Sequence, residues 1–214
     1  MALRKSKLVT GETYHVLNRS VQDIPIFKGQ REIDIFLEAT KFYLQTSPPT
    51  KYSHYRTSRD RFPIRLDQNL VTIINFCVMP NHFHFTLRQE EDNGIRHFIQ
   101  RLSNSFAHYF NTKYNNRGPV FEGNFKAIRV ETDEQLLHLS RYIHLNPVTA
   151  YIVEKPEDYF FSSYRIYIEK EKSEITNPSL VLNQFSSPND YRNFVLSQKD
   201  YQRNLEKIKH ILLE

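Results

Sequence analysis

The sequence predicts an α+β fold organised around one antiparallel sheet. This prediction rests on segments of alternating apolar and polar residues, segments with apolar residues at helical spacing, and turn signals between them. In chain order, strands are expected over residues 12–18, 71–78, 82–88 and 120–130, with helices over 30–45 and 95–114. The order strand, helix, strand, strand, helix, strand is that of the ferredoxin-like (βαββαβ) arrangement, with helices on one face of the sheet.

The first half of the chain supplies a helix and a hairpin. Ile33, Phe36 and Leu44 recur at near-helical spacing, and Ser47-Pro48-Pro49 ends the helix they define. Residues 51–67 are polar, basic and rich in tyrosine without a clear period, so a loop or a weak hairpin arm is expected there. Met79-Pro80-Asn81 is a turn signal between two apolar stretches and predicts the hairpin.

The second half supplies further helices. Thr132, with Gln135 three residues later, has the spacing of a capping box and predicts the start of a helix. We expect this helix to end near Asn146, because Pro147 is unfavourable inside a helix. A short helix is expected over 157–171 and a C-terminal helix over 190–213. The polar stretch 169–188 between them resembles a linker, so we expect a main domain over residues 1–170 and a helical extension over 171–214.

Composition bounds the function without fixing it. The chain has 214 residues, 39% of them hydrophobic, and a net charge of +5, which is compatible with a nucleic-acid partner but does not require one. Cys77 is the single cysteine, which rules out an internal disulfide and a cysteine-based zinc site. No stretch resembles a secretory signal or a membrane span. We therefore expect a cytoplasmic protein with no membrane partner.

The most informative motif is Met79-Pro80-Asn81-His82-Phe83-His84-Phe85. In an extended strand, residues two apart point to the same face, so His82 and His84 would present their imidazoles side by side. Phe83 and Phe85 would point the other way, into a core. Two adjacent imidazoles are good ligands for a divalent metal, although a strand with two structural histidines would show the same pattern.

A second motif lies in the predicted helix that follows Thr132. Residues four apart share a helical face, so Tyr142 aligns with Asn146 on one side and His138 on the other. A tyrosine that attacks phosphorus forms a covalent phosphotyrosine, and a divalent cation polarises the attacked phosphate. Two imidazoles and the amide oxygen of Asn146 would form a neutral ligand set suited to Mg²⁺ or Mn²⁺. Taken singly, each of these residues is better explained by a structural role, and only the joint pattern favours a chemical one.

Together these segments resemble a known family. The histidine motif is similar to the His-hydrophobe-His signature of the HUH single-strand nucleases. The segment Tyr142-Ile143-His144-Leu145-Asn146-Pro147-Val148 resembles the catalytic-helix motif of the REP-associated tyrosine transposases, relatives of the insertion-sequence-200 group. Three more segments fit that family in order, and the resemblance covers roughly residues 10–170; they are Tyr14-His15-Val16-Leu17-Asn18-Arg19, Phe121-Glu122-Gly123-Asn124-Phe125-Lys126-Ala127 and Phe161-Ser162-Ser163-Tyr164.

The resemblance implies a function and assigns roles. Residues 1–170 would be an HUH transposase domain in which His82 and His84 bind Mg²⁺ or Mn²⁺ and Tyr142 is the nucleophile. Asn146 would occupy the position of a polar third ligand. The implied reaction is cleavage and rejoining of single-stranded DNA at a hairpin, through a 5′-phosphotyrosine. The protein would act on nucleoid DNA, as a monomer or a homodimer.

Basic residues in or beside these segments are candidates for contacts with DNA phosphates. They are Arg19, Arg101, Arg117, Lys126 and Arg129. The largest cluster of positive charge lies elsewhere, in residues 51–65, and we expect it to contact DNA as well.

Two other functions remain open from the sequence. A two-histidine phosphoesterase would use the pairs His84-Phe85-Thr86 and His138-Leu139-Ser140, without metal or tyrosine, but needs both pairs on strands. A catalytically silent protein that binds DNA hairpins would have the same sequence pattern as the transposase. Cleavage that survives loss of Tyr142 would indicate the first, and hairpin binding without cleavage would indicate the second.

Overall fold

The structure, a computed structural model, describes residues 7–203. Its sheet has four strands: β1 (Thr13–Arg19), β2 (Val71–Met79), β3 (His82–Gln89) and β4 (Lys126–Val130). They are ordered β2-β3-β1-β4, and every neighbouring pair is antiparallel. With helix α1 (Gln30–Tyr43) before the β2–β3 hairpin and α3 (Gly94–Tyr114) after it, the chain has the predicted ferredoxin-like order.

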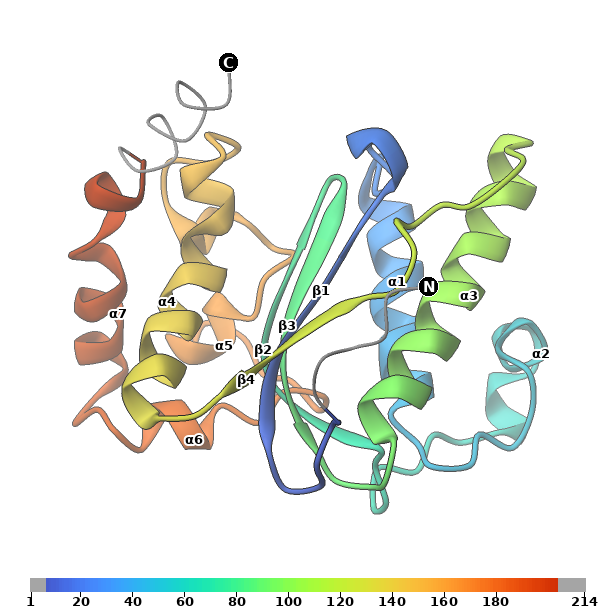
Figure 1. Cartoon of the computed structure of the whole chain (residues 1–214), viewed down its shortest axis with the longest axis horizontal. Helices are drawn as coiled ribbons and strands as arrows, with labels where there is room; N and C mark the ends of the chain where they lie inside the picture. The colour runs from blue at the N-terminus through green and yellow to red at the C-terminus, as the bar shows by residue number, and fades with distance from the viewer. Residues whose placement is uncertain (1–6, 204–214) are drawn as a thin grey trace.

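Helices α1 and α3 cover one face of the sheet, as Figure 1 shows. The core between them is rich in aromatic rings, and Phe36 lies at its centre. The Phe36 ring lies 5.2 Å from that of Phe83 and 5.5 Å from that of Phe106, measured between centroids. This layer holds most of the buried apolar side chains and fixes the sheet on which the other face is built.

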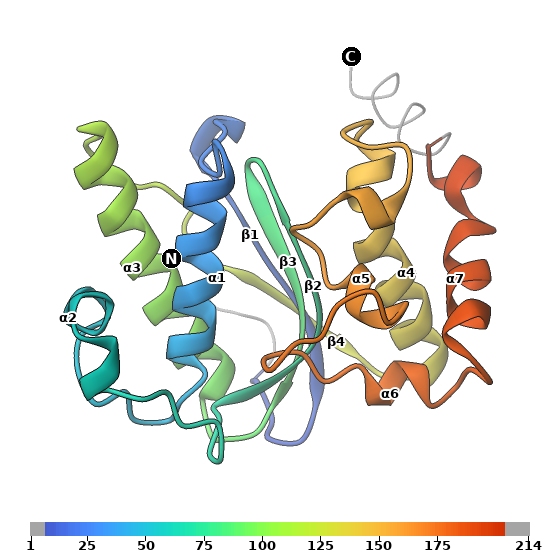
Figure 2. The same ribbon diagram turned by 180° about the vertical axis from the view of Figure 1, so that it is seen from behind.

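The opposite face is covered by the helices that follow β4 (Figures 1 and 2). These are α4 (Asp133–Thr149), α5 (Tyr164–Tyr167), α6 (Ser179–Leu182) and α7 (Pro188–Leu196). The prediction of helices on one face is confirmed for α1 and α3. The later helices were not expected to cover the other face, so the sheet has helices on both sides. Val181, Tyr191 and Val195 are buried in one cluster with Leu145 and Val148 of α4. The domain division at residue 170 stays a prediction, although residues on both sides of it share this cluster.

The segment 51–67 is not the loop or hairpin arm that we expected. It contains α2 (Tyr52–Thr57) and a short 3-10 helix, η2 (Arg59–Arg61). The Tyr52 and Tyr55 rings pack on Phe42 at centroid distances of 5.5 and 4.8 Å. Because these two tyrosines are three residues apart, one helical turn buries both, and this packing outweighs the weak period of the sequence.

Two predicted boundaries near β4 and α4 were wrong. The paired part of the last strand begins only at Lys126, because Gly123 lies in a turn with φ of +50° that ends the extended backbone before it. Helix α4 continues past Asn146 to Thr149, with Pro147 inside its last turn. The carbonyl of Pro147 accepts a hydrogen bond from the Ile152 amide at 2.9 Å, so the chain closes the helix end there.

The C-terminal third is more broken and more packed than we expected. In place of a helix over 157–171 there is a 3-10 helix, η3 (Pro156–Asp158), followed by α5. The expected linker 169–188 contains α6, and its Thr176 forms an isolated parallel bridge with Ile73 on the edge of the sheet. The expected helix 190–213 is interrupted after Leu196, and its part after residue 203 lies outside the described residues. A further 3-10 helix, η1 (Val21–Asp23), follows β1. In residues 7–203, no helix is long and apolar enough to cross a membrane.

Candidate functional site

The two histidines of β3 lie side by side on the face that α4 covers. Their ring centroids are 4.9 Å apart and the ring planes are nearly perpendicular, at 88°. Phe83 and Phe85 alternate with them and are fully buried in the core under α1 and α3. The alternation of the strand thus separates two potential metal ligands from two core residues, as the sequence predicted.

A third histidine joins the pair, and the sequence prediction missed it. His15 of β1 has its Nε2 2.9 Å from Nδ1 of His84, and the two rings are stacked with centroids 5.1 Å apart. Sheet register brings them together, since β1 pairs with β3 and His15 lies opposite Thr86, the residue two beyond His84. A signal was present in the sequence: Tyr14 and Val16 are core residues, so His15 between them must point to the other face.

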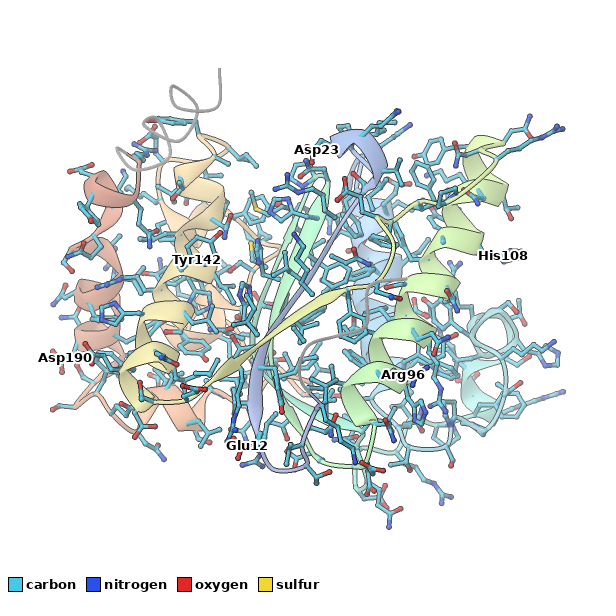
Figure 3. The ribbon with its side chains drawn as sticks, in the orientation of Figure 1. Glu12, Asp23, Arg96, His108, Tyr142 and Asp190 are labelled. Atoms are coloured by element: carbon cyan, nitrogen blue, oxygen red, sulfur yellow. The ribbon has the colours of Figure 1, made fainter. Side chains whose placement is uncertain are left out.

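Tyr142 faces this group of histidines from α4. Its ring centroid lies 5.7 Å from that of His84 and 6.3 Å from that of His15, with both pairs edge to face. The residue is 39% exposed, so a substrate can reach it. Figure 3 labels Tyr142 near the middle of α4.

The start of α4 has the predicted cap by Thr132, while the return bond from Gln135 reaches the residue before it. The hydroxyl of Thr132 accepts a hydrogen bond from the Gln135 amide at 3.1 Å, and Gln135 Oε1 accepts one from the Glu131 amide at 2.8 Å. Ile143, Leu145 and Val148 are fully buried and hold the helix against the sheet and the C-terminal helices. The position of Tyr142 over the histidines is therefore set by both the helix cap and the packing of α4.

A chain of hydrogen bonds orients His82. The side-chain amide nitrogen of Asn81 donates to Asp23 Oδ1 at 3.0 Å, and the amide oxygen of Asn81 lies 2.6 Å from His82 Nδ1. Because that oxygen can only accept, His82 Nδ1 carries the proton and Nε2 keeps its lone pair. Asp23 in turn forms an ion pair with Arg19 at 3.2 Å. The Nε2 lone pair of His82 is thus the one left available for coordination.

Burial keeps all three rings neutral. It lowers the pKa of His15 to about 4 and, together with the positive charge of Arg19, lowers the pKa of His82 to about 4. Burial also lowers the pKa of His84 well below its usual value, with smaller contributions from His82 and His15. A neutral imidazole is the form that binds a metal, so near pH 7 the group is ready to act as a ligand.

Asn146 and His138, which the sequence placed on either side of Tyr142, differ in their surroundings. Asn146 lies one turn beyond Tyr142, and its side-chain nitrogen is 3.5 Å from the Tyr142 carbonyl oxygen. His138 is turned toward α7, with its ring 6.2 Å from that of Phe194 and its Nδ1 2.6 Å from the Arg141 guanidinium. Because His138 lies on a helix and packs on α7, the two His-x-Thr/Ser pairs do not form the strand arrangement that a two-histidine phosphoesterase needs.

His144, inside the tyrosine motif, belongs to the core rather than to the site. It is fully buried, with Nδ1 2.6 Å from the Tyr191 hydroxyl and Nε2 2.8 Å from the Ser163 hydroxyl. These contacts join α4 to α7 and to the segment before α5. His144 therefore holds α4, the helix that carries Tyr142, against α7 and the segment before α5.

The five predicted DNA-binding residues are divided by the fold. Arg19 lies directly opposite His82 in the sheet register, and Lys126 lies two strands from His84 in the same row, so both share the histidine face. Arg129 pairs with Glu12 at 2.7 Å and alternates to the other face. Arg101 of α3 donates to the Thr46 carbonyl at 3.2 Å, and Arg117 is exposed in the turn after α3. Only Arg19 and Lys126 adjoin the candidate site.

The donors present fit a divalent metal. Across the described residues 7–203, no three side chains of histidine, cysteine, aspartate or glutamate converge as a metal site. A metal here would bind to His82 and His84, with further oxygen donors from an amide such as Asn146, from water or from a substrate phosphate. The free Nε2 of His82 supports this fit.

Fold and site together define a class of protein: a ferredoxin-like domain in which a neutral histidine pair faces a tyrosine on a covering helix. Within this chain, residues 58–146 match the family model of the IS200-like transposases. The match spans His82, His84, Tyr142 and Asn146 and confirms the resemblance that the sequence motifs indicated. His15 and Arg19 lie outside it.

A solved structure gives the same result for the fold. The chain is similar to a REP-associated tyrosine transposase determined in complex with a REP hairpin, with a TM-score of 0.53 and 14% sequence identity. The alignment covers 87% of this chain and 96% of the other, so the shared fold extends through nearly the whole molecule. No curated protein sequence matches the chain.

Proposed function

We propose that this protein is a metal-dependent endonuclease and strand transferase that acts on single-stranded DNA at hairpins. The observation that carries the proposal is the neutral pair His82 and His84 facing an accessible Tyr142, within the segment that matches IS200-like transposases. The similar REP-associated transposase was solved with a DNA hairpin, which supports hairpin DNA as the substrate. The proposal includes action in the cytoplasm, on nucleoid DNA.

In the proposed reaction, Tyr142 is the nucleophile. Its hydroxyl oxygen bonds to the phosphorus of the scissile phosphodiester as the bond from phosphorus to the 3′ oxygen breaks. The phenol loses its proton and the departing 3′ oxygen gains one, which leaves a 5′-phosphotyrosine and a free 3′-OH. Attack by another 3′-OH on the phosphotyrosine reverses these steps and joins the strands.

His82 and His84, with Asn146 as a third donor, would hold Mg²⁺ or Mn²⁺ beside the scissile phosphate. When bound, such an ion polarises the phosphate and stabilises the leaving oxygen. Asn81 positions His82 by fixing the proton on Nδ1. His15 can position His84 in the same way, because His84 binds through Nε2 only if its Nδ1 donates to His15 Nε2. Arg19 and Lys126 lie where they can contact phosphates on either side of the site.

The proposal is tested by incubating the protein with hairpin oligonucleotides that carry unpaired flanks and a 5′ or 3′ label, in Mn²⁺ or Mg²⁺. A denaturing gel should show protein-linked DNA for the wild type. Tyr142→Phe should lose this band by about 10³-fold or more, and His82→Ala with His84→Ala should lose it as well. Tyr14→Phe, a buried tyrosine of β1, is the matched control and should keep the band.

Two other outcomes would replace the proposal. Cleavage that persists in Tyr142→Phe would indicate hydrolysis without a covalent intermediate. Binding of the hairpins with no cleavage by the wild type, in either metal, would indicate a silent hairpin-binding protein. Sedimentation of the protein with and without hairpin DNA distinguishes a monomer from a homodimer.

A further inference from the structure

A cavity lies on the side of the sheet opposite Tyr142. It has a volume of about 540 Å³, is open to solvent and is lined by residues of α1, α2 and α3 together with Lys51. Figures 1 and 2 show these helices on one side of the sheet and α4 on the other, so the sheet separates this cavity from the candidate active site. A volume of this size is typical of small-ligand sites.

The cavity combines aromatic and cationic side chains, and we call it the tyrosine–arginine cavity. Tyr43 and Tyr109 are half-buried and present aromatic surface, with the buried Tyr52 packed beside Tyr43. Arg31, Lys51 and Arg56 supply exposed cations. His108, another lining residue, is labelled in Figure 3 on α3. The lining contains no aspartate or glutamate. The cavity therefore offers flat apolar surface and uncompensated positive charge together.

Nearby carboxylates are already engaged. Glu32 is ion-paired with Lys113 of the cavity wall and accepts a hydrogen bond from the Tyr109 hydroxyl at 3.1 Å. Glu38 is ion-paired with Arg59 at 2.7 Å. Among the residues that the structure describes, Arg31, Lys51 and Arg56 make no ion pair. An anionic ligand would thus meet three cations whose charge is not neutralised by an internal partner.

We propose that the tyrosine–arginine cavity binds a nucleotide, with its base against the tyrosines and its phosphate on Arg31, Lys51 or Arg56. Bases stack on aromatic side chains without regard to sequence, and arginine matches phosphate geometry. A purely apolar ligand would leave the cations unpaired, and a simple inorganic anion would leave the aromatic surface uncovered. A nucleotide matches both parts of the cavity. Arg61 and Arg65, further along the same segment, line another cavity of about 460 Å³ together with Asp67.

The nucleotide has two potential sources, a DNA strand and the free nucleotide pool. This inference goes beyond the proposed cleavage reaction, because the cavity contains none of the groups assigned to that chemistry. A test without divalent metal therefore separates cavity binding from the proposed cleavage reaction. EDTA should prevent cleavage, whereas binding at the cavity should persist.

The experiment is photocrosslinking in EDTA followed by peptide mapping. One arm uses a single-stranded oligonucleotide containing 5-iododeoxyuridine, and the other uses free 8-azido-dAMP. We expect crosslinked peptides to contain Tyr43, Tyr52 or Tyr109. Crosslinks from the oligonucleotide alone identify a strand as the ligand, and crosslinks from both probes identify a general nucleotide site.

A matched pair of variants tests the charge. Arg31→Gln with Arg56→Gln should reduce crosslinking at the cavity peptides at least fivefold, while Arg96→Gln, at the exposed start of α3 (Figure 3), should not change it. Both changes are at exposed positions, and a circular dichroism melt checks that the fold is intact. The inference is overturned if neither probe labels the cavity peptides, or if the double variant labels them as strongly as the wild type.

Discussion

The two faces of strand β3 carry side chains of different chemistry. Under α1 and α3, β3 contributes Phe83 and Phe85 to a core of fully buried apolar side chains. Under α4, the same strand contributes His82 and His84, which meet His15 and Tyr142. The polar face can hold reactive groups because the apolar face supplies the burial that stabilises the strand. One eight-residue strand thus contributes one set of alternate residues to the core and the other set to the candidate site.

The largest expected effect tests this difference directly, by comparing a core-facing and a site-facing residue of β3. Phe85→Ala should lower the free energy of unfolding by about 3–5 kcal/mol, because it leaves a cavity in the aromatic core. His82→Ala should lower it by less than about 1 kcal/mol, since this ring is half-buried, yet should abolish formation of protein-linked DNA. Urea unfolding and the hairpin assay measure the two effects. Similar losses of stability in both variants would contradict the comparison.

The next effect concerns the buried polar contacts of the α4 side. His144→Leu should lower the free energy of unfolding by about 2 kcal/mol at pH 7, because the hydroxyls of Tyr191 and Ser163 each lose a hydrogen bond. Cleavage at a temperature below the melting transition should persist, since His144 does not contact the candidate site. Loss of cleavage in a folded variant would show that His144 has more than a structural role.

The same residue makes stability depend on pH. Complete burial lowers the pKa of His144 to about 3, against about 6.5 for an unfolded chain. Between these values the unfolded state binds more protons, so the free energy of unfolding should fall as the pH falls from about 6.5 toward 3. His144→Leu should therefore lose less stability between pH 7 and pH 5 than the wild type does. His97→Asn, on the exposed face of α3, is the surface control.

A smaller effect tests the hydrogen bond that orients His82. Asn81→Ala should weaken Mn²⁺ binding by about 10- to 100-fold, because His82 is then no longer held with its proton on Nδ1. Isothermal titration calorimetry measures the affinity without any DNA. Asn104→Ala, at an exposed position of α3, is the matched control and should bind Mn²⁺ like the wild type. Unchanged affinity in Asn81→Ala would remove Asn81 from the positioning role.

The smallest effect is at the start of the tyrosine helix. Thr132→Ala removes the side chain that accepts a hydrogen bond from Gln135 and should cost about 1 kcal/mol of stability. Thr149→Ala, at the other end of α4, should cost nothing comparable. Thermal melts of both variants give the difference, and equal melting temperatures would show that packing alone fixes the helix.

Local patterns predicted the fold and part of the site. The βαββαβ order followed from the periodicity of the strands and helices. His82 and His84 followed from the spacing within one strand, and Tyr142 from the resemblance of its helix to a family motif. Figure 1 shows what such patterns cannot give, namely that the helices after β4 pack on the second face. Helix α2 was missed because it is stabilised by contacts of Tyr52 and Tyr55 with Phe42. Phe42 lies outside the segment 51–67, so the pattern within the segment does not reveal these contacts.

The rest of the site depends on contacts between distant parts of the chain. His15 reaches His84 across 69 positions of sequence, through a sheet register that no single strand encodes. The link from Asp23 through Asn81 to His82 joins two turns in the same way. Tyr191 and Ser163 explain why His144 is buried, but they lie on segments whose packing on α4 the sequence did not reveal.

The contact of α7 with α4 has a practical consequence for dissecting the protein. A shortened chain ending near residue 170 would retain all four strands, the histidines and Tyr142, so it would seem complete by motif. It would nevertheless uncover the buried surface around His144 and take away Tyr191, Val181 and Val195, which pack there. If such a truncated chain were inactive, the cause would be the lost packing of α4 and not the loss of Tyr142 or the histidines. Fragments meant for activity assays should therefore extend at least to residue 196.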